Sequence, residues 1–143
     1  MTDIDWIESS LELLAPHADR LGGLVYPRFF VHFPEAETLF GGGELGKSTQ
    51  ESMIVPLLMG LKDIADGKTY MLTIERWLED HREYGVTLPM YSVMLDSLLL
   101  GMREAVGDLW TTEMDGAWQE VLARLLLLVE GVYAEWQVDS CPQ

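Results

Sequence analysis

Hydrophobic positions recur along this chain with the period of an α-helix almost from end to end. Apolar residues return every three or four positions, the spacing that places them on one face of a helix. The segments with this spacing are residues 3–14, 17–33, 48–65, 70–84, 87–106 and 112–136. No stretch alternates with a period of two for long enough to form a strand. The pattern therefore predicts an all-α domain of six or seven helices.

Glycine and threonine residues mark several ends of these helices. Gly67, Gly85 and Gly107 each follow the last periodic residue of a helix, where a glycine commonly terminates it. Thr111 or Thr112 is suited to cap the last helix, because a threonine hydroxyl accepts a hydrogen bond from a free backbone N–H.

Other glycine and proline residues interrupt the pattern. The pair at 22–23 favours a close helix crossing, and Pro27 removes one backbone hydrogen bond and favours a bend. The glycine run at 41–46 follows no strand and lacks the spacing of a phosphate-binding loop. We therefore expect a flexible connector at about 41–47 and a short tail at about 137–143.

Length and composition limit the class of protein. With 143 residues, of which 48% are hydrophobic and 10% aromatic, the chain fits one ordered domain spanning 1–143. A formal net charge of −15 argues against binding to nucleic acid or to an anionic membrane. Cys141 is the only cysteine, and the acidic first residues do not resemble a signal peptide. These features lead us to expect a cytoplasmic protein.

His81 is the candidate for ligand chemistry, because it closes the apolar stripe of a short helix. A lone histidine there is more often a hydrogen-bonded boundary residue than a metal ligand, although imidazole is capable of both roles. The 8 methionines are equally compatible with ordinary gap filling and with a core that surrounds an irregular group. The choice therefore depends on residues elsewhere in the chain.

Several short motifs, in their order and spacing, resemble bacterial globins of the flavohaemoglobin and single-domain haemoglobin group. The match runs from about His17 to Trp136, and the motifs that carry it are residues 26–35 (YPRFFVHFPE), 39–40 (LF), 81–86 (HREYGV), Tyr91, 110–111 (WT) and 117–118 (AW). The resemblance implies a globin fold in which six to seven helices surround a pocket for haem b. It places His81 at the position of the iron ligand.

The resemblance also assigns the remaining residues of the pocket. Contacts with the porphyrin are implied for Phe40, Ile54, Leu57, Trp77, Val86 and Tyr91. Tyr26 and Gln50 correspond to distal hydrogen-bond donors, although Thr49 is an alternative to Gln50 because the count passes through the glycine run. Tyr91 and Glu135 correspond to a proximal pair that hydrogen-bonds to the far nitrogen of the histidine.

Three features depart from the pattern of that group. Asp80 precedes the histidine where a basic residue is usual, and Pro27 and Pro56 fall inside the distal helices. No flavin- or nicotinamide-binding segment follows the globin-like part, so we expect any redox turnover to need an external reductase.

The resulting hypothesis is a haem protein that binds dioxygen, nitric oxide or carbon monoxide. Nitric oxide dioxygenation is an enzymatic extension of it, and a peroxidase-like reaction is a side activity of the same chemistry. The alternatives are a haem-free globin-like scaffold and a gas or redox sensor module. The apolar faces of the last two helices are compatible with a homodimer, and equally with the core alone.

Overall fold

A computed structural model describes residues 2–40 and 43–139, with side chains except at 39–40, 43–51 and 138–139. This part of the chain forms six α-helices and three 3-10 helices and contains no strand, which confirms the predicted all-α class. In chain order the elements are α1 (Asp3–Leu14), η1 (Ala15–His17), α2 (Ala18–His32), η2 (Pro34–Phe40), α3 (Gly43–Ala65), α4 (Met71–Glu83), α5 (Leu88–Val106), η3 (Gly107–Leu109) and α6 (Thr112–Asp139).

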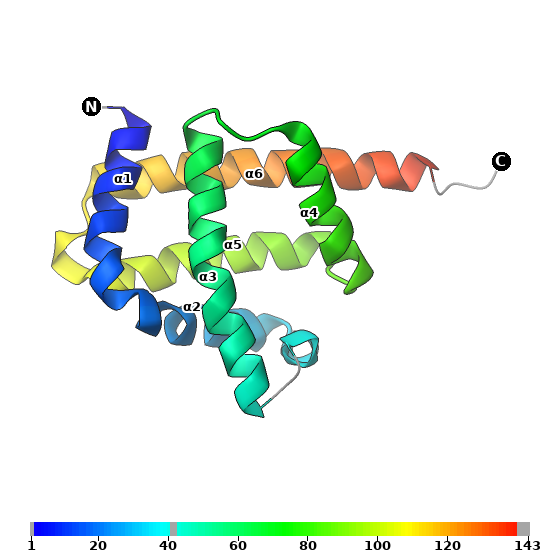
Figure 1. The fold of residues 1–143 in the computed structure, drawn as a ribbon, viewed down its shortest axis with the longest axis horizontal. Helices are drawn as coiled ribbons and strands as arrows, with labels where there is room; N and C mark the ends of the chain where they lie inside the picture. The colour runs from blue at the N-terminus through cyan, green and yellow to red at the C-terminus, as the bar shows by residue number, and fades with distance from the viewer. Residues whose placement is uncertain (1, 41–42, 140–143) are drawn as a thin grey trace.

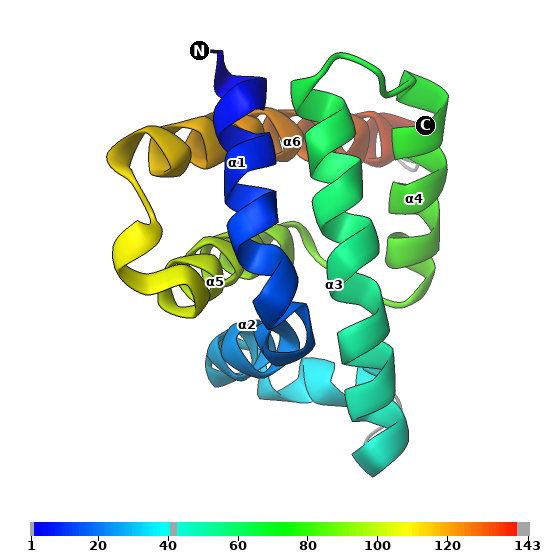
Figure 2. The same ribbon diagram turned by 60° about the vertical axis from the view of Figure 1, so that its left-hand side comes forward.

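The helices form two crossing layers. In Figures 1 and 2, α1 and α3 lie side by side and cross over α5 and α6. The most extensive packing is between α2 and α5, followed by that between α1 and α6. The helix α4 stands apart from α1 and α2, beside the C-terminal half of α6 (Figure 1). Its main packing partner is α6, so α6 supports the helix that carries His81.

Local signals explain where several helices begin and end. The Asp5 carboxylate accepts hydrogen bonds from the Thr2 backbone N–H at 2.9 Å and from the Thr2 hydroxyl at 3.0 Å, which fixes the start of α1. At the start of α6 the Thr111 hydroxyl accepts a bond of 3.1 Å from the Met114 N–H. The ends predicted at Gly67, Gly85 and Gly107 are confirmed, and all three glycines have positive φ.

The crossing of α2 with α5 depends on a glycine of α5. A Cβ atom placed on Gly101 would lie 2.6 Å from Cγ2 of Val25, so only glycine lets the two helices approach this closely. Gly23, in the pair expected to permit a crossing, is exposed and has nothing within 4 Å of its Cβ position. The described structure thus has a tight approach at Gly101, beside the pair, whose other member Gly22 is buried.

Parts of the predicted connector and of the predicted tail are helical. Residues 43–47 belong to α3 and residues 137–139 belong to α6, while 41–42 and 140–143 lie outside the described residues. A glycine weakens a helix by only about 1 kcal/mol. Packing of α3 on α1, α2 and α6 is sufficient to offset that cost.

One buried polar contact joins α1 to α6, which are distant in the sequence. The Trp118 indole N–H donates to the Ser10 hydroxyl at 2.7 Å, and that hydroxyl donates to the Ile7 carbonyl at 2.7 Å. This satisfies every polar group of a buried contact between α1 and α6.

No single described helix combines the length and apolar composition needed to cross a membrane, and α4 with Leu88–Leu109 meets that test only as a pair bent by 109°.

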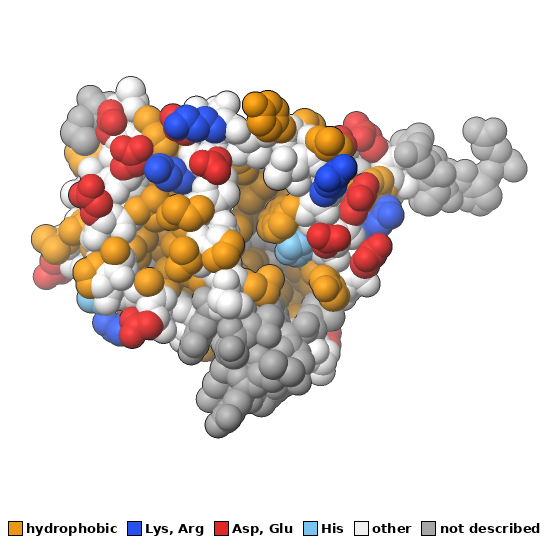
Figure 3. Space-filling view, viewed as in Figure 1, with side chains coloured by type: hydrophobic (Ala, Val, Ile, Leu, Met, Phe, Trp, Pro, Cys, Tyr) orange, Lys and Arg blue, Asp and Glu red, His pale blue; other side chains and the backbone are white. Residues whose placement is uncertain are grey.

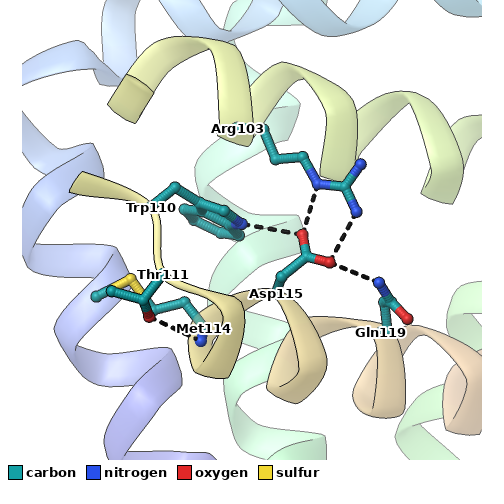
Figure 4. A network of polar contacts seen from close by, with 6 residues as sticks. All are labelled: Arg103, Trp110, Thr111, Met114, Asp115 and Gln119. Atoms are coloured by element: carbon teal, nitrogen blue, oxygen red, sulfur yellow. Dashed lines mark hydrogen bonds and ion pairs between the residues drawn. The ribbon is translucent and has the colours of Figure 1, made fainter. Parts of the chain in front are cut away.

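The corner between α5 and α6 is held by one carboxylate. Asp115 accepts hydrogen bonds from the guanidinium of Arg103, from the indole of Trp110 at 2.9 Å and from the amide of Gln119 (Figure 4). The Arg103 hydrogen bond is the main reason that the pKa of Asp115 lies below its usual value. The corner thus depends on Asp115 being ionised.

Candidate functional site

His81 lies in the last turn of α4, where a Schellman motif closes the helix. The Gly85 N–H donates to the Arg82 carbonyl at 2.9 Å, and the Val86 N–H donates to the His81 carbonyl at 3.1 Å. Gly85 has a φ of +85°, a conformation that favours glycine. The motif therefore fixes the backbone of His81 just before the turn between α4 and α5.

The His81 ring has a defined protonation pattern. Its Nδ1 atom lies 2.7 Å from the Trp77 carbonyl oxygen, one turn earlier in α4. A carbonyl can only accept, so Nδ1 carries the proton and the neutral ring keeps its lone pair on Nε2. Burial lowers the pKa of His81, against smaller opposing effects of the Trp77 hydrogen bond and the Asp80 charge. A neutral imidazole with one fixed N–H is the form that binds a metal ion.

Aromatic rings surround the imidazole. The Trp77 ring centroid lies 4.3 Å from that of His81, and the Tyr91 centroid lies 6.0 Å from His81 and 6.1 Å from Trp77. The Tyr91 hydroxyl lies 3.1 Å from the hydroxyl of Tyr133 on α6. Burial, together with this hydrogen bond, raises the pKa of Tyr91, so its phenol stays protonated.

An apolar hollow adjoins this group of rings. Figure 3 shows it between α3 and α4, with hydrophobic side chains around it and a histidine at its edge. The helix α3 packs mainly on α1, α2 and α6, and α4 packs mainly on α6, so the two helices are not closely packed on each other. Leu57 on α3 and Trp77 on α4 are only partly buried. The space between α3 and α4 thus has mainly apolar walls.

Besides Trp77 and Tyr91, four predicted pocket residues belong to the main hydrophobic core. Tyr26 on α2 is 2% exposed and stacks on Phe30 with the ring centroids 6.0 Å apart. Burial raises the pKa of Tyr26 to about 12. Ile54 is fully buried in the same core, and Leu57 and Val86 pack against it. The side chains of Phe40, Thr49 and Gln50 lie outside the described residues.

The proximal hydrogen bonds differ from those that the resemblance implies. Nδ1 of His81 pairs with the Trp77 carbonyl rather than with Tyr91 or Glu135. Glu135 is exposed on α6. The Tyr91 hydroxyl instead contacts the hydroxyl of Tyr133, two positions before Glu135 in α6. Two positions along a helix turn a side chain by more than a right angle, so Tyr133 and Glu135 point in different directions.

Tyr133 is a functional candidate that sequence reasoning missed. Its hydroxyl donates to the Val86 carbonyl at 2.8 Å, so it contacts both the corner after α4 and the ring beside His81. The signal in the sequence was its place in the apolar stripe of the last helix, which is also typical of an ordinary core residue.

A separate apolar cavity of about 200 Å³ lies between α1, η1, α2 and α3. Its lining consists of Leu11, Leu14, Ala15, Ala18, Leu21, Val55, Leu58 and Met59. None of these is a predicted site residue, so the cavity is distinct from the surroundings of His81.

Comparison with known proteins supports the resemblance given by the motifs. No protein-family profile matches the chain. It is 23% identical over 128 residues to a flavohemoprotein of Halalkalibacterium halodurans, with 87% of this chain and 31% of the relative covered. A flavohemoprotein of Bordetella pertussis is 25% identical over 126 residues (87% and 31%), and one of Xylella fastidiosa is 29% identical over 136 residues (92% and 34%).

The chain thus spans about a third of the length of these curated relatives. The predicted similarity to flavohaemoproteins is confirmed over most of the chain. Together with the all-helical architecture, it confirms the predicted globin fold.

Proposed function

We propose that this chain is a haem-binding globin in which Nε2 of His81 holds the iron of haem b. The observation that carries the proposal is the 2.7 Å contact between Nδ1 of His81 and the Trp77 carbonyl. This contact leaves Nε2 as the ring nitrogen with a free lone pair. The chain that carries this histidine resembles flavohaemoproteins over most of its length. The relatives are named as proteins with both flavin and haem, and the haem part is the one that this fold suits.

The residues around His81 fit a flat macrocycle. Among the residues that the structure describes, no three His, Cys, Asp or Glu side chains come together as a metal site. One imidazole is too few ligands for a bare ion, whereas haem brings four nitrogens of its own. The hollow between α3 and α4 has the apolar walls that a porphyrin face requires (Figure 3).

Haem would supply an iron atom that binds a diatomic gas. Tyr26 would donate its O–H to a gas molecule that gains negative charge, and a pKa of about 12 keeps that proton in place at neutral pH. Trp77 and Tyr91, whose rings pack beside that of His81, would shield the imidazole from water. The ligands proposed are dioxygen, nitric oxide and carbon monoxide.

Nitric oxide dioxygenation is the enzymatic reaction proposed for the same site. One nitric oxide, one dioxygen and one electron give one nitrate ion, so turnover needs a one-electron donor. We propose a flavin-containing reductase as that donor, because the relatives are named as proteins with both flavin and haem. A protein with a net charge of −15 would favour a donor with a basic docking surface. The haem-free scaffold is not favoured.

The absorption spectrum of the purified protein tests haem binding. We expect a Soret band that shifts when the reduced protein is exposed to carbon monoxide. Nitrate formation from nitric oxide, dioxygen and a chemical reductant tests the enzymatic extension, and Tyr26→Phe should slow it by about tenfold or more. Colourless protein after expression with ample haem would overturn haem binding, and a nitrate yield no higher than in free buffer would overturn the dioxygenase reaction alone.

A further inference from the structure

One phenol, that of Tyr133, connects α6 to the end of α4. Its O–H donates to the Val86 carbonyl at 2.8 Å, and the Val86 N–H donates to the His81 carbonyl at 3.1 Å. Two hydrogen bonds therefore separate the Tyr133 hydroxyl from the backbone of His81. Because α6 is the main packing partner of α4, this hydrogen-bond path lies in the contact that supports the helix of His81.

The same phenol orients the ring that packs beside the imidazole. A hydroxyl has one proton, and Tyr133 uses its proton on the Val86 carbonyl. Tyr91 must then be the donor in the 3.1 Å contact between the two hydroxyls. The hydrogen-bond chain runs in one direction, from Tyr91 to Tyr133 to Val86, and it fixes a ring that lies 6.0 Å from that of His81.

A second contact between α4 and α6 offers a comparison. The Arg82 guanidinium lies 4.2 Å from the centre of the Trp136 ring, as a cation–π pair. This contact holds the helices together without a hydrogen bond to Val86 or Tyr91. The Trp136 ring also packs on the Tyr133 ring, with the centroids 4.9 Å apart, so it is the Arg82 cation whose removal tests attachment of α4 and leaves the Tyr133 ring in its surroundings.

We propose that Tyr133 is the positioning residue of this site, which holds both the backbone and the ring environment of His81 in the geometry needed by the iron ligand. The proposal rests on the proposed haem binding and goes beyond it, because it assigns control of the ligand to a residue of α6 that does not touch the imidazole directly. Tyr133 acts on His81 through Val86 on one side and through Tyr91 on the other.

The holoprotein gives the first readout. In Tyr133→Phe the ring remains and the hydrogen-bond chain is lost, so the iron–histidine stretching band of the reduced protein should shift and broaden in resonance Raman spectra. Haem affinity should fall by roughly tenfold or more, the usual effect of losing a partner behind a metal ligand. Tyr84→Phe is the matched control, because the Tyr84 ring is exposed at the same helix end. Arg82→Gln should weaken the attachment of α4 to α6 and leave the band unchanged, because it keeps the Trp136 ring against Tyr133.

The apoprotein gives a second readout that does not need haem. Nitrogen NMR of the His81 ring should show one Nδ1–H form with sharp lines in the wild type and broadened or doubled lines in Tyr133→Phe. Tyr91→Phe keeps the bond from Tyr133 to Val86, so it should have a smaller effect. The double variant should be no worse than Tyr133→Phe alone, because both substitutions break one chain.

The outcomes separate this proposal from haem binding. If the wild type binds haem and Tyr133→Phe matches it in the Raman band and in the NMR lines, the positioning role is wrong and haem binding stands. If the wild type binds no haem, the proposed function fails, and the apoprotein spectra still decide whether Tyr133 controls the His81 ring. Should Tyr133→Phe not fold, an unchanged His81 ring in Tyr91→Phe would overturn control of the ring through Tyr91.

Discussion

The Nδ1 atom of His81 lies 2.7 Å from the carbonyl oxygen of Trp77. Because the two residues are one turn apart in α4, the helix itself sets the tautomer of the ring. The backbone carbonyl of His81 is bound in turn by the amide of Val86 at 3.1 Å. A side chain held at both its ring and its backbone loses little freedom when it becomes a ligand.

Tyr26→Phe should remove a source of instability at alkaline pH. Burial raises the pKa of Tyr26 from 10.0 to about 12, so the folded chain holds this proton more tightly than the unfolded chain. The contribution of Tyr26 to stability is therefore complete below pH 10 and is lost as the pH rises towards 12. Urea unfolding at a series of alkaline pH values should show a smaller loss of stability in Tyr26→Phe than in the wild type.

The control for this experiment is Tyr70→Phe, because the Tyr70 ring is 80% exposed. It should follow the wild-type curve at every pH. Identical alkaline losses in the wild type and in Tyr26→Phe would contradict the burial of an un-ionised phenol at position 26.

Gly101→Ala should destabilise the protein by about 1–3 kcal/mol through overpacking. Its Cβ would lie 2.6 Å from Cγ2 of Val25, which is fully buried and has a stiff β-branched side chain. Gly116→Ala, on α6, is the matched control, since its Cβ would meet nothing within 4 Å. That change should stabilise by about 0.5–1 kcal/mol. Thermal and urea unfolding measure both.

A second substitution tests the mechanism of the Gly101 effect. Val25→Ala removes the methyl group that the new Cβ would meet, so Gly101→Ala should cost less in that background than in the wild type. Equal costs in the two backgrounds would show that the close approach of α2 and α5 is not the cause.

Asp115→Asn should loosen the corner between α5 and α6 and cost about 1–2 kcal/mol of stability. The guanidinium of Arg103 would lose its ionic partner, while the indole of Trp110 would keep an acceptor. The pKa of Asp115 is lowered from 3.8 in the folded state, so its contribution is complete above pH 3.8 and is lost as the pH falls through the lower folded value.

Acid unfolding followed by circular dichroism measures that contribution. The gap in stability between the wild type and Asp115→Asn should be constant near neutral pH and should close in acid. Asp108→Asn is the comparison, because Asp108 is an exposed carboxylate of the same corner. A gap that persists at the lowest pH would contradict the assignment to the ionised carboxylate of Asp115.

Helix ends with a local cause could be predicted from the sequence. The range 3–14 was predicted and α1 spans Asp3–Leu14, because the Asp5 carboxylate fixes its start and a proline follows its end. The end of α4 at Gly85 was equally predictable, since a positive φ at that position favours glycine. Both signals lie within a few residues of the feature that they determine.

Features that depend on distant contacts could not be predicted in this way. The glycine run suggests a loop, yet α3 begins at Gly43 because packing offsets the cost of its glycines. Which glycine permits a close crossing depends on the partner helix, and Gly101 was not singled out. The resemblance implies Glu135 as the partner of Tyr91, whereas the rotation of α6 brings Tyr133 to Tyr91. Sequence spacing does not determine that rotation.

Replacing the ligand and then supplying it in solution tests the iron-binding role of His81 most directly. His81→Gly should remove the imidazole and leave the Schellman end of α4 in place, because that end is made by backbone bonds. We predict that the variant purifies with little haem, and that free imidazole added with haem restores the wild-type spectrum of the reduced protein under carbon monoxide. A His81→Gly protein that holds a full complement of haem with an unchanged Soret band, without imidazole, would contradict the assignment.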